Sequence, residues 1–565
     1  MSSAITKTVR LTLQDASRQV PLPEMIHFQR AAYRHLLDLR EAATRVGAIP
    51  VRIGPLQFDC LDALRQPLNI GCGAALAGLE LLTGLTNAHP GKLVELHLER
   101  FEPVWMATAS AARALGQSVT VVSTSKPRVW QRLRLSAYRL KRSLQRRRLP
   151  TLSGDDGGSI LMVPRMPGHL ADQIPVAREL RDHFGCRVRF VVVDRRLIGL
   201  IRAEGFDVGN LYDAGATWAP TVRREAVRTE AALDAVLDSP LRTTQIVERR
   251  REELFRQLAR RIAHEGFHDA YRAAYCIGGL LDRLRPAAVV VGNPYTMEGR
   301  IAAQSARARG IGAYAVEHGS IFPDDPCWAE FSVDEVFVWG TPSRRALESC
   351  GVDSAKIVVS GGPRHDAVFR EHAETASSRK ANIVLVAVSG PGDNVSLAEH
   401  QQFIELLYRA AERRPDLSWV VKLHRKDRPE FYYRAATPMP RNIQVVTADY
   451  RRDGRQIFEW LARAQALVTV SSTCAVDAMA LNVPVVAVDV WPPGGGIAAE
   501  FLHCGACRRV RTADELAIEI GRACEGSFDP ATRAAADRYA AEHFANRGNA
   551  ARTVAERIMT NLSSR

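Results

Sequence analysis

The strongest constraint on the fold is an alternation of buried strands and amphipathic helices that runs twice along the chain. The first run extends from SILMVP (159–164) to GAYAVEHGS (312–320), and the second from ANIVLVAVSGPGD (381–393) to VPVVAVDV (483–490). Short apolar segments separated by helical patterns are typical of parallel sheets with helices on both faces. We therefore predict an α/β protein with two tandem Rossmann-like parallel-sheet domains.

Two further regions flank these domains. The N-terminal region has weaker α/β periodicity with one clear strand, SVTVVST (118–124), and it ends at the polar, glycine-rich segment TLSGDDGG (151–158). Such a segment favours a domain boundary. From about residue 528 the pattern is helical without strands. We predict an N-terminal α/β extension over 1–150, a first domain over 158–345, a second domain over 346–527 and C-terminal helices over 528–565.

One segment of the N-terminal extension is strongly basic. Residues 126–148, KPRVWQRLRLSAYRLKRSLQRRR, hold ten basic residues and no acidic one, and their apolar residues recur at helical spacing. Two interpretations are open: an amphipathic helix that lies on an anionic membrane surface, or a surface helix that buries its apolar stripe on the protein. Nucleic acid is not expected as a partner, because no stacking module or helix-turn-helix pattern accompanies the charge.

The composition indicates a cytoplasmic globular protein. Hydrophobic residues make up 46% of the chain and charged residues 24%, which are ordinary globular values. No apolar run reaches the roughly 18–20 residues that span a bilayer, and the N-terminus lacks the apolar centre of a signal peptide. The ten scattered cysteines suit free thiols in a reducing compartment. We expect a cytoplasmic location, peripheral on the inner face of the cell membrane if residues 126–148 bind lipid.

Candidate catalytic residues follow two strands of the first domain. In the loop PGHL, Gly168 allows a tight turn, and His169 is a candidate general base or substrate contact. At the end of a later strand stand Glu317, His318 and Gly319. A histidine of ordinary pKa can take a proton from an acceptor hydroxyl, and Glu317 is a candidate to orient it, although neighbours on a strand face opposite ways. The alternative for each histidine is a structural role.

The second domain opens with a conformationally specified turn, GGPRHD. Gly361 and Pro363 define the turn, and two charged residues follow. Arg364 either reaches a phosphate as a planar fork or pairs with Asp366 to lock the turn. The sequence does not decide between these two roles.

Candidate phosphate-binding residues follow the strands of the second domain. One strand ends in a basic cluster, another in hydroxyl groups before a helix, and the first in a glycine loop. Hydroxyls and helical N–H groups at such a junction can hold a phosphate, and glycine lets the backbone approach a nucleotide. The alternatives are a solvated basic strand end and plain helix capping. The candidates are Lys422, His424, Ser471, Ser472, Thr473, Ser389 and Gly390.

In their order and spacing, these motifs resemble the GT-B glycosyltransferase superfamily, and within it the surface-polysaccharide and CDP-glycerol glycerophosphotransferase branches. The resemblance covers residues 159–525. The motif Glu317-His318-Gly319 is similar to the family's histidine-glycine motif, and PGHL resembles the loop that carries the base histidine in plant-type and antibiotic-type GT-B enzymes. One departure is Arg425, which stands where the family has a proline after His424. The other matching motifs are the turn of Gly361, Pro363, Arg364 and Asp366, the strand end Lys422-Leu423-His424, and Ser471-Ser472-Thr473 before Val483-Pro484-Val485.

The resemblance implies a metal-independent transferase without a cofactor. The second domain would bind a nucleotide-activated donor, and His318 would deprotonate the acceptor. The implied reaction is sugar transfer to a cell-surface polysaccharide or a lipid-linked acceptor, in polysaccharide biosynthesis of the cell envelope. Three alternatives are open: a CDP-polyol phosphotransferase of polymer synthesis, a nucleotide-sugar 2-epimerase, which would need several carboxylates in its site, and a non-catalytic scaffold on the membrane face.

Overall fold

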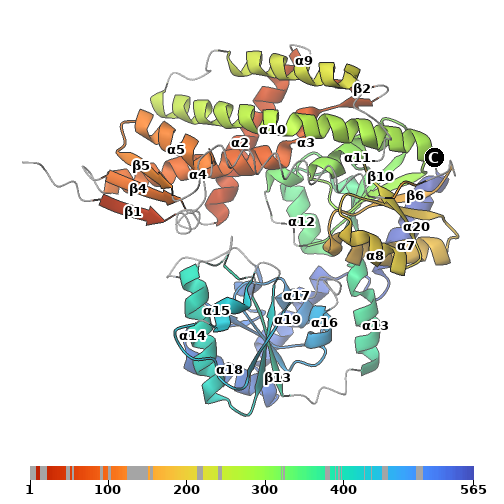
Figure 1. The fold of residues 1–565 in the computed structure, drawn as a ribbon. Helices are drawn as coiled ribbons and strands as arrows, with labels where there is room; N and C mark the ends of the chain where they lie inside the picture. Colours follow the sequence, from red (N-terminus) through yellow and green to blue (C-terminus); the bar gives the residue numbers. More distant parts are fainter. Residues whose placement is uncertain are drawn as a thin grey trace, which may run out of the picture.

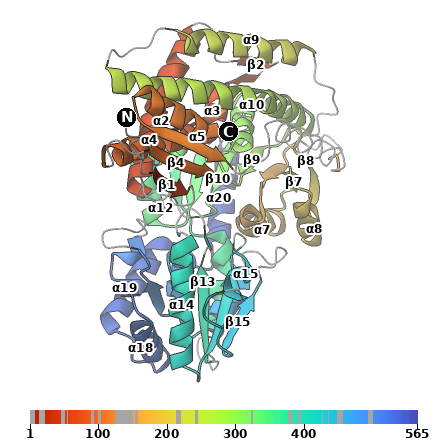
Figure 2. The ribbon, with the colours of Figure 1, turned by 60° about the vertical axis from the view of Figure 1, so that its left-hand side comes forward.

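The computed structural model divides into two lobes, one above the other in Figure 1 and again in the turned view of Figure 2. The basic segment 126–148 lies outside the described residues, as do Ser389 and Arg425, so the interpretations of that segment stay predictions. The structure describes residues 8–12, 22–45, 51–53, 56–88, 93–98, 103–123, 150–152, 157–212, 220–239, 245–319, 321, 323, 325–375, 382–388, 390–391, 395, 397–424, 427–433, 435–447, 456–491 and 500–564.

The first lobe contains a sheet of seven parallel strands in the order β12-β11-β10-β9-β6-β7-β8. β6 comes first in sequence among the strands of this sheet, yet it lies in the middle, between β7 and β9. The winding direction therefore reverses between β6 and β9. This is the doubly wound order of a Rossmann fold. The strands are β6 (Ile160–Val163), β7 (Val188–Val192), β8 (Asp207–Asn210), β9 (Ala288–Val291), β10 (Gly312–Val316), β11 (Glu335–Val338) and β12 (Ile357–Val359).

Helices cover both faces of this sheet, which explains why its strands are mostly apolar. Ile160 and Met162 face one hydrophobic core, while Leu161 and Val163 face the other. Alternate side chains of a strand point to opposite faces, so a strand buried on both faces has few polar positions. The first core holds α7 (Pro167–Asp182), α8 (Arg196–Ala203) and α20 (Ala550–Ser563), and the second holds α10 (Ile246–Leu284) and α11 (Met297–Arg307).

The second lobe repeats the same plan. Its six parallel strands have the order β15-β14-β13-β16-β17-β18, which is again the Rossmann order, with the reversal between β13 and β16. The predicted pair of parallel-sheet domains is therefore confirmed. The strands are β13 (Ile383–Val388), β14 (Ser418–Leu423), β15 (Ile443–Val446), β16 (Ala466–Thr469), β17 (Val485–Val488) and β18 (Arg508–Val510), with helices α14 (Leu397–Arg413), α15 (Pro429–Tyr433), α16 (Gln456–Leu461), α17 (Cys474–Ala480), α18 (Ala513–Cys524) and α19 (Pro530–His543).

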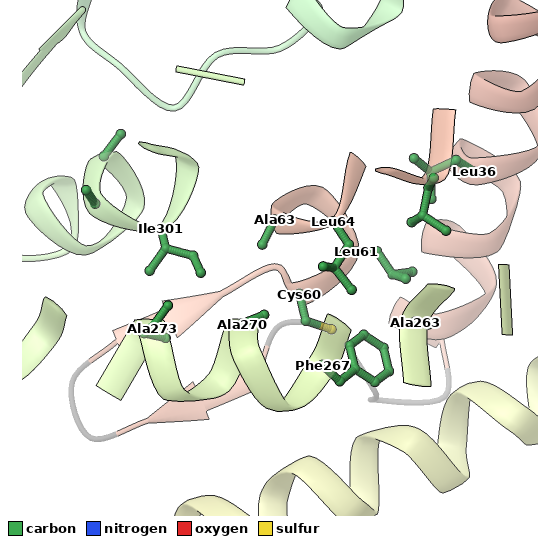
Figure 3. Close-up of a cluster of buried hydrophobic side chains, with 14 of the residues drawn as sticks. Leu36, Cys60, Leu61, Ala63, Leu64, Ala263, Phe267, Ala270, Ala273 and Ile301 are labelled. Carbon is green, nitrogen blue, oxygen red and sulfur yellow. The ribbon is translucent and has the colours of Figure 1, made fainter. Parts of the chain in front are cut away.

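The N-terminal region packs into the first lobe and shares its core. Figure 3 shows Cys60, Leu61 and Leu64 against Phe267 of α10. The two segments approach so closely that a Cβ on Gly266 would lie 2.6 Å from a Leu64 methyl carbon. The region comprises a parallel sheet of β1 (Thr8–Thr12), β4 (Leu93–Leu98) and β5 (Val119–Ser123), a hairpin of β2 (Val51–Ile53) and β3 (Leu56–Phe58), and helices α2 (Leu22–Arg45), α3 (Cys60–Ala63), α4 (Arg65–Ala88) and α5 (Pro103–Ala114); α9 (Pro220–Leu237) lies alongside α10.

The chain crosses between the lobes twice, and the two crossings lie side by side. The first runs from β12, which extends the first sheet beyond the expected boundary at residue 345, through the 3₁₀ helix η3 (Pro363–His365) into α13 (Asp366–Thr375). The second runs from α19 back to α20, which packs on the first lobe beside α7 (Figure 1). Helix α12 (Thr341–Ser349) precedes the first crossing. Among the described residues, no helix is both long and apolar enough to cross a membrane.

Candidate active site

The candidate catalytic residues of the first domain meet where its winding direction reverses. Val163 ends β6 and Val291 ends β9, and these strands are paired neighbours. His169 follows β6 in the first turn of α7, and Gly292 follows β9 directly. In doubly wound sheets, ligands bind beyond the carboxyl ends of the strands at this reversal point. The sequence therefore places His169 at the position where this fold binds its ligands.

The structure brings the two predicted histidines together. The rings of His169 and His318 lie with their centroids 4.3 Å apart, tilted by 60°. Burial, and to a smaller extent the nearby Arg364, lowers the pKa of His318 to about 4, against the opposing effect of a hydrogen bond with the Gly292 backbone. Within the described part of the chain, Nδ1 of His318 is buried and has no hydrogen-bond partner. His318 is therefore a neutral imidazole with an unused nitrogen at neutral pH.

Glu317 turns away from the histidine pair. Its carboxylate accepts hydrogen bonds from the backbone N–H of Trp339 at 2.6 Å and from the Ser343 hydroxyl at 2.7 Å. Burial raises the pKa of Glu317 to about 8, although both hydrogen bonds lower it. Among the hydrogen bonds of the described residues, none joins this carboxylate to the His318 ring. Glu317 ties the end of β10 to the start of α12 and thereby positions His318 through the backbone.

Arg364 lies in the first crossing and reaches back to the histidine loops. Its Nε is 3.0 Å from both carboxylate oxygens of Asp172, and Nη2 also donates to Asp172. The same Nη2 lies 2.8 Å from the carbonyl oxygens of both Gly168 and His318. The guanidinium carbon stands 5.3 Å above the centre of the Trp339 ring. Arg364 thus clamps together the two loops that carry the histidines.

Asp366 does not pair with the Arg364 side chain, which was one of the two roles that the sequence left open for Arg364. Its two carboxylate oxygens accept hydrogen bonds from the backbone N–H groups of Ala550 at 3.0 Å and Ala551 at 2.8 Å, and burial raises its pKa. Asp366 therefore caps the start of α20, at the far end of the second crossing. A carboxylate satisfies the free N–H groups of a helix start well, which explains its position.

The glycines of these motifs differ in what they do. Gly361 has φ of +89°, and a Cβ there would overlap the carbonyl oxygen of Ala545, so the two crossings pass each other only because residue 361 is glycine. Pro363 begins η3 just after this turn. Gly168 and Gly319 are not among the residues with positive φ, and a Cβ at either would meet no close contact. Their backbone does not require glycine.

In the second lobe, the candidate residues line the carboxyl ends of β13, β14 and β16. Ser472 N–H bonds to the Thr469 hydroxyl at 3.1 Å, and the Ser472 hydroxyl accepts from the backbone of Cys474 at 3.3 Å. Ser471 is buried, whereas Thr473 is exposed and caps α17 without a side-chain hydrogen bond. These hydroxyls stand at the reversal point between β13 and β16, where a nucleotide binds in such sheets.

Lys422 and His424 are half-buried on the neighbouring strand end. The Lys422 ammonium lies close enough to Cys474 to lower its pKa, although burial dominates and raises that pKa to about 11. Gly390, with φ of +72°, lets the loop after β13 press on the backbone of Asp427. Lys422 and the start of α17 are thus brought together, as a phosphate site requires.

Three residues of the site were missed by the sequence analysis. Asp172 follows His169 by three positions on α7, so helical spacing was a usable signal for their proximity. Gly292 leaves room for His169, because a Cβ there would lie 2.6 Å from the histidine Cβ. His365 lies 2.9 Å from Asp477 on α17 and packs on Phe544, with ring centroids 4.5 Å apart. Arg364 and His365 therefore reach opposite lobes from adjacent positions.

A family model described as "Putative glycosyltransferase (DUF6716)" matches residues 343–491, which include the first crossing and the second-lobe candidates but neither histidine of the first lobe. No curated protein matches the chain.

Solved structures with a similar fold include epimerases and glycosyltransferases. They are the UDP-GlcNAc 2-epimerase from Neisseria meningitidis bound to UDP-GlcNAc (13% identity, TM-score 0.46, 71% of this chain and 100% of that one), CalG4, the calicheamicin glycosyltransferase (17%, 0.42, 72% and 99%), and a glycosyltransferase from Rickettsia africae ESF-5 (13%, 0.43, 72% and 100%).

Proposed function

We propose that the chain is a glycosyltransferase that moves a sugar from a nucleotide-activated donor to a cell-surface polysaccharide or glycolipid acceptor. The observation that carries the proposal is that each lobe has polar residues at the point where its strand order reverses, and that these residues differ between the lobes. Neutral, buried histidines occupy the first, and a lysine with hydroxyl groups occupies the second. The match of residues 343–491 to the family model described as a putative glycosyltransferase supports a transferase activity.

In the proposed reaction, His318 accepts the proton of an acceptor hydroxyl while the hydroxyl oxygen bonds to the anomeric carbon of the donor sugar. The bond from that carbon to the phosphate oxygen breaks, and its electron pair leaves with the nucleotide. A single displacement of this kind inverts the anomeric configuration. With a pKa of about 4, His318 is unprotonated at neutral pH, as a general base must be before it accepts a proton. In this proposal, Lys422 balances the charge that develops on the leaving phosphate.

The carboxylates of the first lobe favour transfer over 2-epimerisation. Asp172 is bound by Arg364, Asp366 caps α20, and Glu317 is held by Trp339 and Ser343. An epimerase needs carboxylates that are free to move protons on the sugar. We therefore favour sugar transfer over epimerisation. The donor screen below distinguishes sugar transfer from polyol-phosphate transfer.

We also propose that transfer proceeds without a bound metal ion. Within the described ranges, no group of three or more histidine, cysteine, aspartate or glutamate side chains gathers as a ligand set. Cationic side chains can neutralise a leaving diphosphate in place of a metal. Turnover should be unchanged by EDTA, and loss of turnover that added Mg²⁺ or Mn²⁺ restores would overturn this part.

A thermal-shift screen of the full chain tests the proposal. The probes are UDP-, GDP-, dTDP-, CMP- and CDP-linked donors together with the free nucleotides. A ligand at about 100 times its Kd adds about 2.7 kcal/mol of stability, which raises the melting temperature measurably. A shift with one nucleotide sugar that is lost in Lys422→Met supports the transferase. A response to CDP-glycerol alone would favour the polyol-phosphate reaction, and no response to any nucleotide would favour a non-catalytic scaffold.

A further inference from the structure

The two nitrogens of the His169 ring have different surroundings. Nδ1 lies 3.1 Å from the backbone nitrogen of Arg165 in a hydrogen bond. A backbone N–H can only donate, so Nδ1 must be the acceptor and carries no hydrogen. A neutral imidazole has one ring hydrogen, and it must therefore be on Nε2.

The surroundings of His169 keep the ring neutral. The side chain is 1% exposed, and burial is the main reason why its pKa lies well below the usual range. The charged and titratable groups that face it are His318 at the end of β10, Arg364 from η3 and Arg165 from its own loop, and all three lower its pKa further. The carboxylate on the same helix, Asp172, is bound on both oxygens by Arg364.

The hydrogen on Nε2 points to no acceptor among the residues that the structure describes. Nε2 is buried and makes no hydrogen bond within the described part of the chain. A buried N–H without an acceptor destabilises the folded state. The ring is nevertheless held in place, by His318 on one side and by the space that Gly292 leaves on another. The ring is therefore fixed, with one N–H that has no acceptor among the described residues.

We propose that His169 is a neutral hydrogen-bond donor to an oxygen of the bound sugar substrate, and that it is not the general base. A base histidine has the opposite arrangement, in which one ring N–H donates to the protein and the other ring nitrogen carries a free electron pair, as in His318, whose Nδ1 has no partner among the described residues. His318 is then left as the base. The identity of the substrate rests on the proposed function, whereas the protonation pattern of His169 does not.

Nitrogen NMR of the full chain tests the protonation pattern without any substrate. The histidine rings are labelled with ¹⁵N, and the His169 signals are assigned by their absence in His169→Gln. We expect a hydrogen on Nε2 and none on Nδ1, unchanged from about pH 8 to about pH 5.5. A hydrogen on Nδ1, or a doubly protonated ring in this range, would overturn the proposal. This result is independent of whether any nucleotide sugar binds.

Kinetics with the donor found by the screen test the contact with substrate. His169→Gln keeps an N–H donor and should stay within about tenfold of the parent, whereas His169→Leu should lose about 10²–10³-fold, as removal of one fixed donor does elsewhere. The acid limb of the pH–rate profile should persist in His169→Gln. Loss of that limb, or equal rates of the Gln and Leu variants, would overturn the proposal. If His169→Leu does not melt cooperatively, the pH profile of His169→Gln decides alone.

Discussion

The carboxyl edges of the two sheets differ in chemistry although their strands have the same order. At the first edge, His169 and Asp172 are almost fully buried, and Arg364 donates its hydrogen bonds to Asp172 and to backbone carbonyls. At the second edge, Lys422 and Thr473 remain partly or fully exposed. Burial keeps the histidines of the first edge neutral, whereas Lys422 at the second edge remains in contact with water. The fold thus sets where both sites lie, and burial sets what each can do.

Removal of the proposed base should have the largest effect and should separate the two edges. His318→Ala is expected to lower turnover about 10²–10⁴-fold, the range for loss of general base catalysis. Donor binding by thermal shift should be unchanged, because the donor is assigned to the other lobe. The matched control is His183→Ala at the exposed end of α7, which should leave turnover intact. Loss of donor binding in His318→Ala would break the division between the edges.

Among these variants, removal of Arg364 should lower the free energy of unfolding the most. Arg364→Met leaves the carboxylate of Asp172 buried without its partner, which typically costs about 3–5 kcal/mol. The loss should grow as pH rises, because a buried carboxylate is tolerated only when it is protonated. Urea unfolding at several pH values measures this.

Two further variants define the source of that loss. Arg364→Met with Asp172→Asn should recover much of the stability, because the uncompensated charge is gone. Arg196→Met removes an exposed ion pair with Asp194 and should cost no more than about 1 kcal/mol. An equal loss in Arg196→Met and Arg364→Met would contradict the view of the first edge as desolvated.

The buried carboxyl of Glu317 should make stability depend on pH. Its folded pKa of about 8 lies above the ordinary value of 4.5, so the folded state holds a proton that the unfolded chain has lost between these values. Stability must therefore fall as pH rises through this window. At 1.36 kcal/mol per unit, the wild type should lose roughly 4 kcal/mol relative to Glu317→Gln between pH 5 and pH 8. Parallel stability–pH curves for the two proteins would refute the shift.

The smallest expected effect is on donor binding at the second edge. Lys422→Met should weaken binding of the donor about tenfold or more, since a charge-assisted hydrogen bond contributes about 1.5–3 kcal/mol. Lys356→Met, in η2 (Ser354–Lys356), provides a matched control. The pH–rate profile should keep its shape, because His318 is untouched. A changed acid limb in Lys422→Met would mean that the two edges are electrostatically coupled.

The sequence predicted the strands with an uninterrupted apolar run better than the short or partly polar ones. The apolar runs that became β6, β10, β13 and β17 were recognised from their composition. The strands β8, β11, β12 and β18 were not, because β12 has only three residues and the other three contain charged or amide side chains among three or four residues. For the site, strand ends indicated His169, His318, Lys422 and the serine loop. Their grouping depended on strand order, which no local pattern contains.

The sequence by itself determined the two α/β repeats and the polar residues at the ends of their strands, because local periodicity records which faces of each segment are buried. Only the tertiary structure decided how these residues are used. Arg364 pairs with Asp172, 192 positions away, and Asp366 caps a helix 184 positions away. The hydrogen of His169 is set by the backbone N–H of Arg165. Every arginine and aspartate is a chemically adequate partner, so the choice is made only when distant segments pack together.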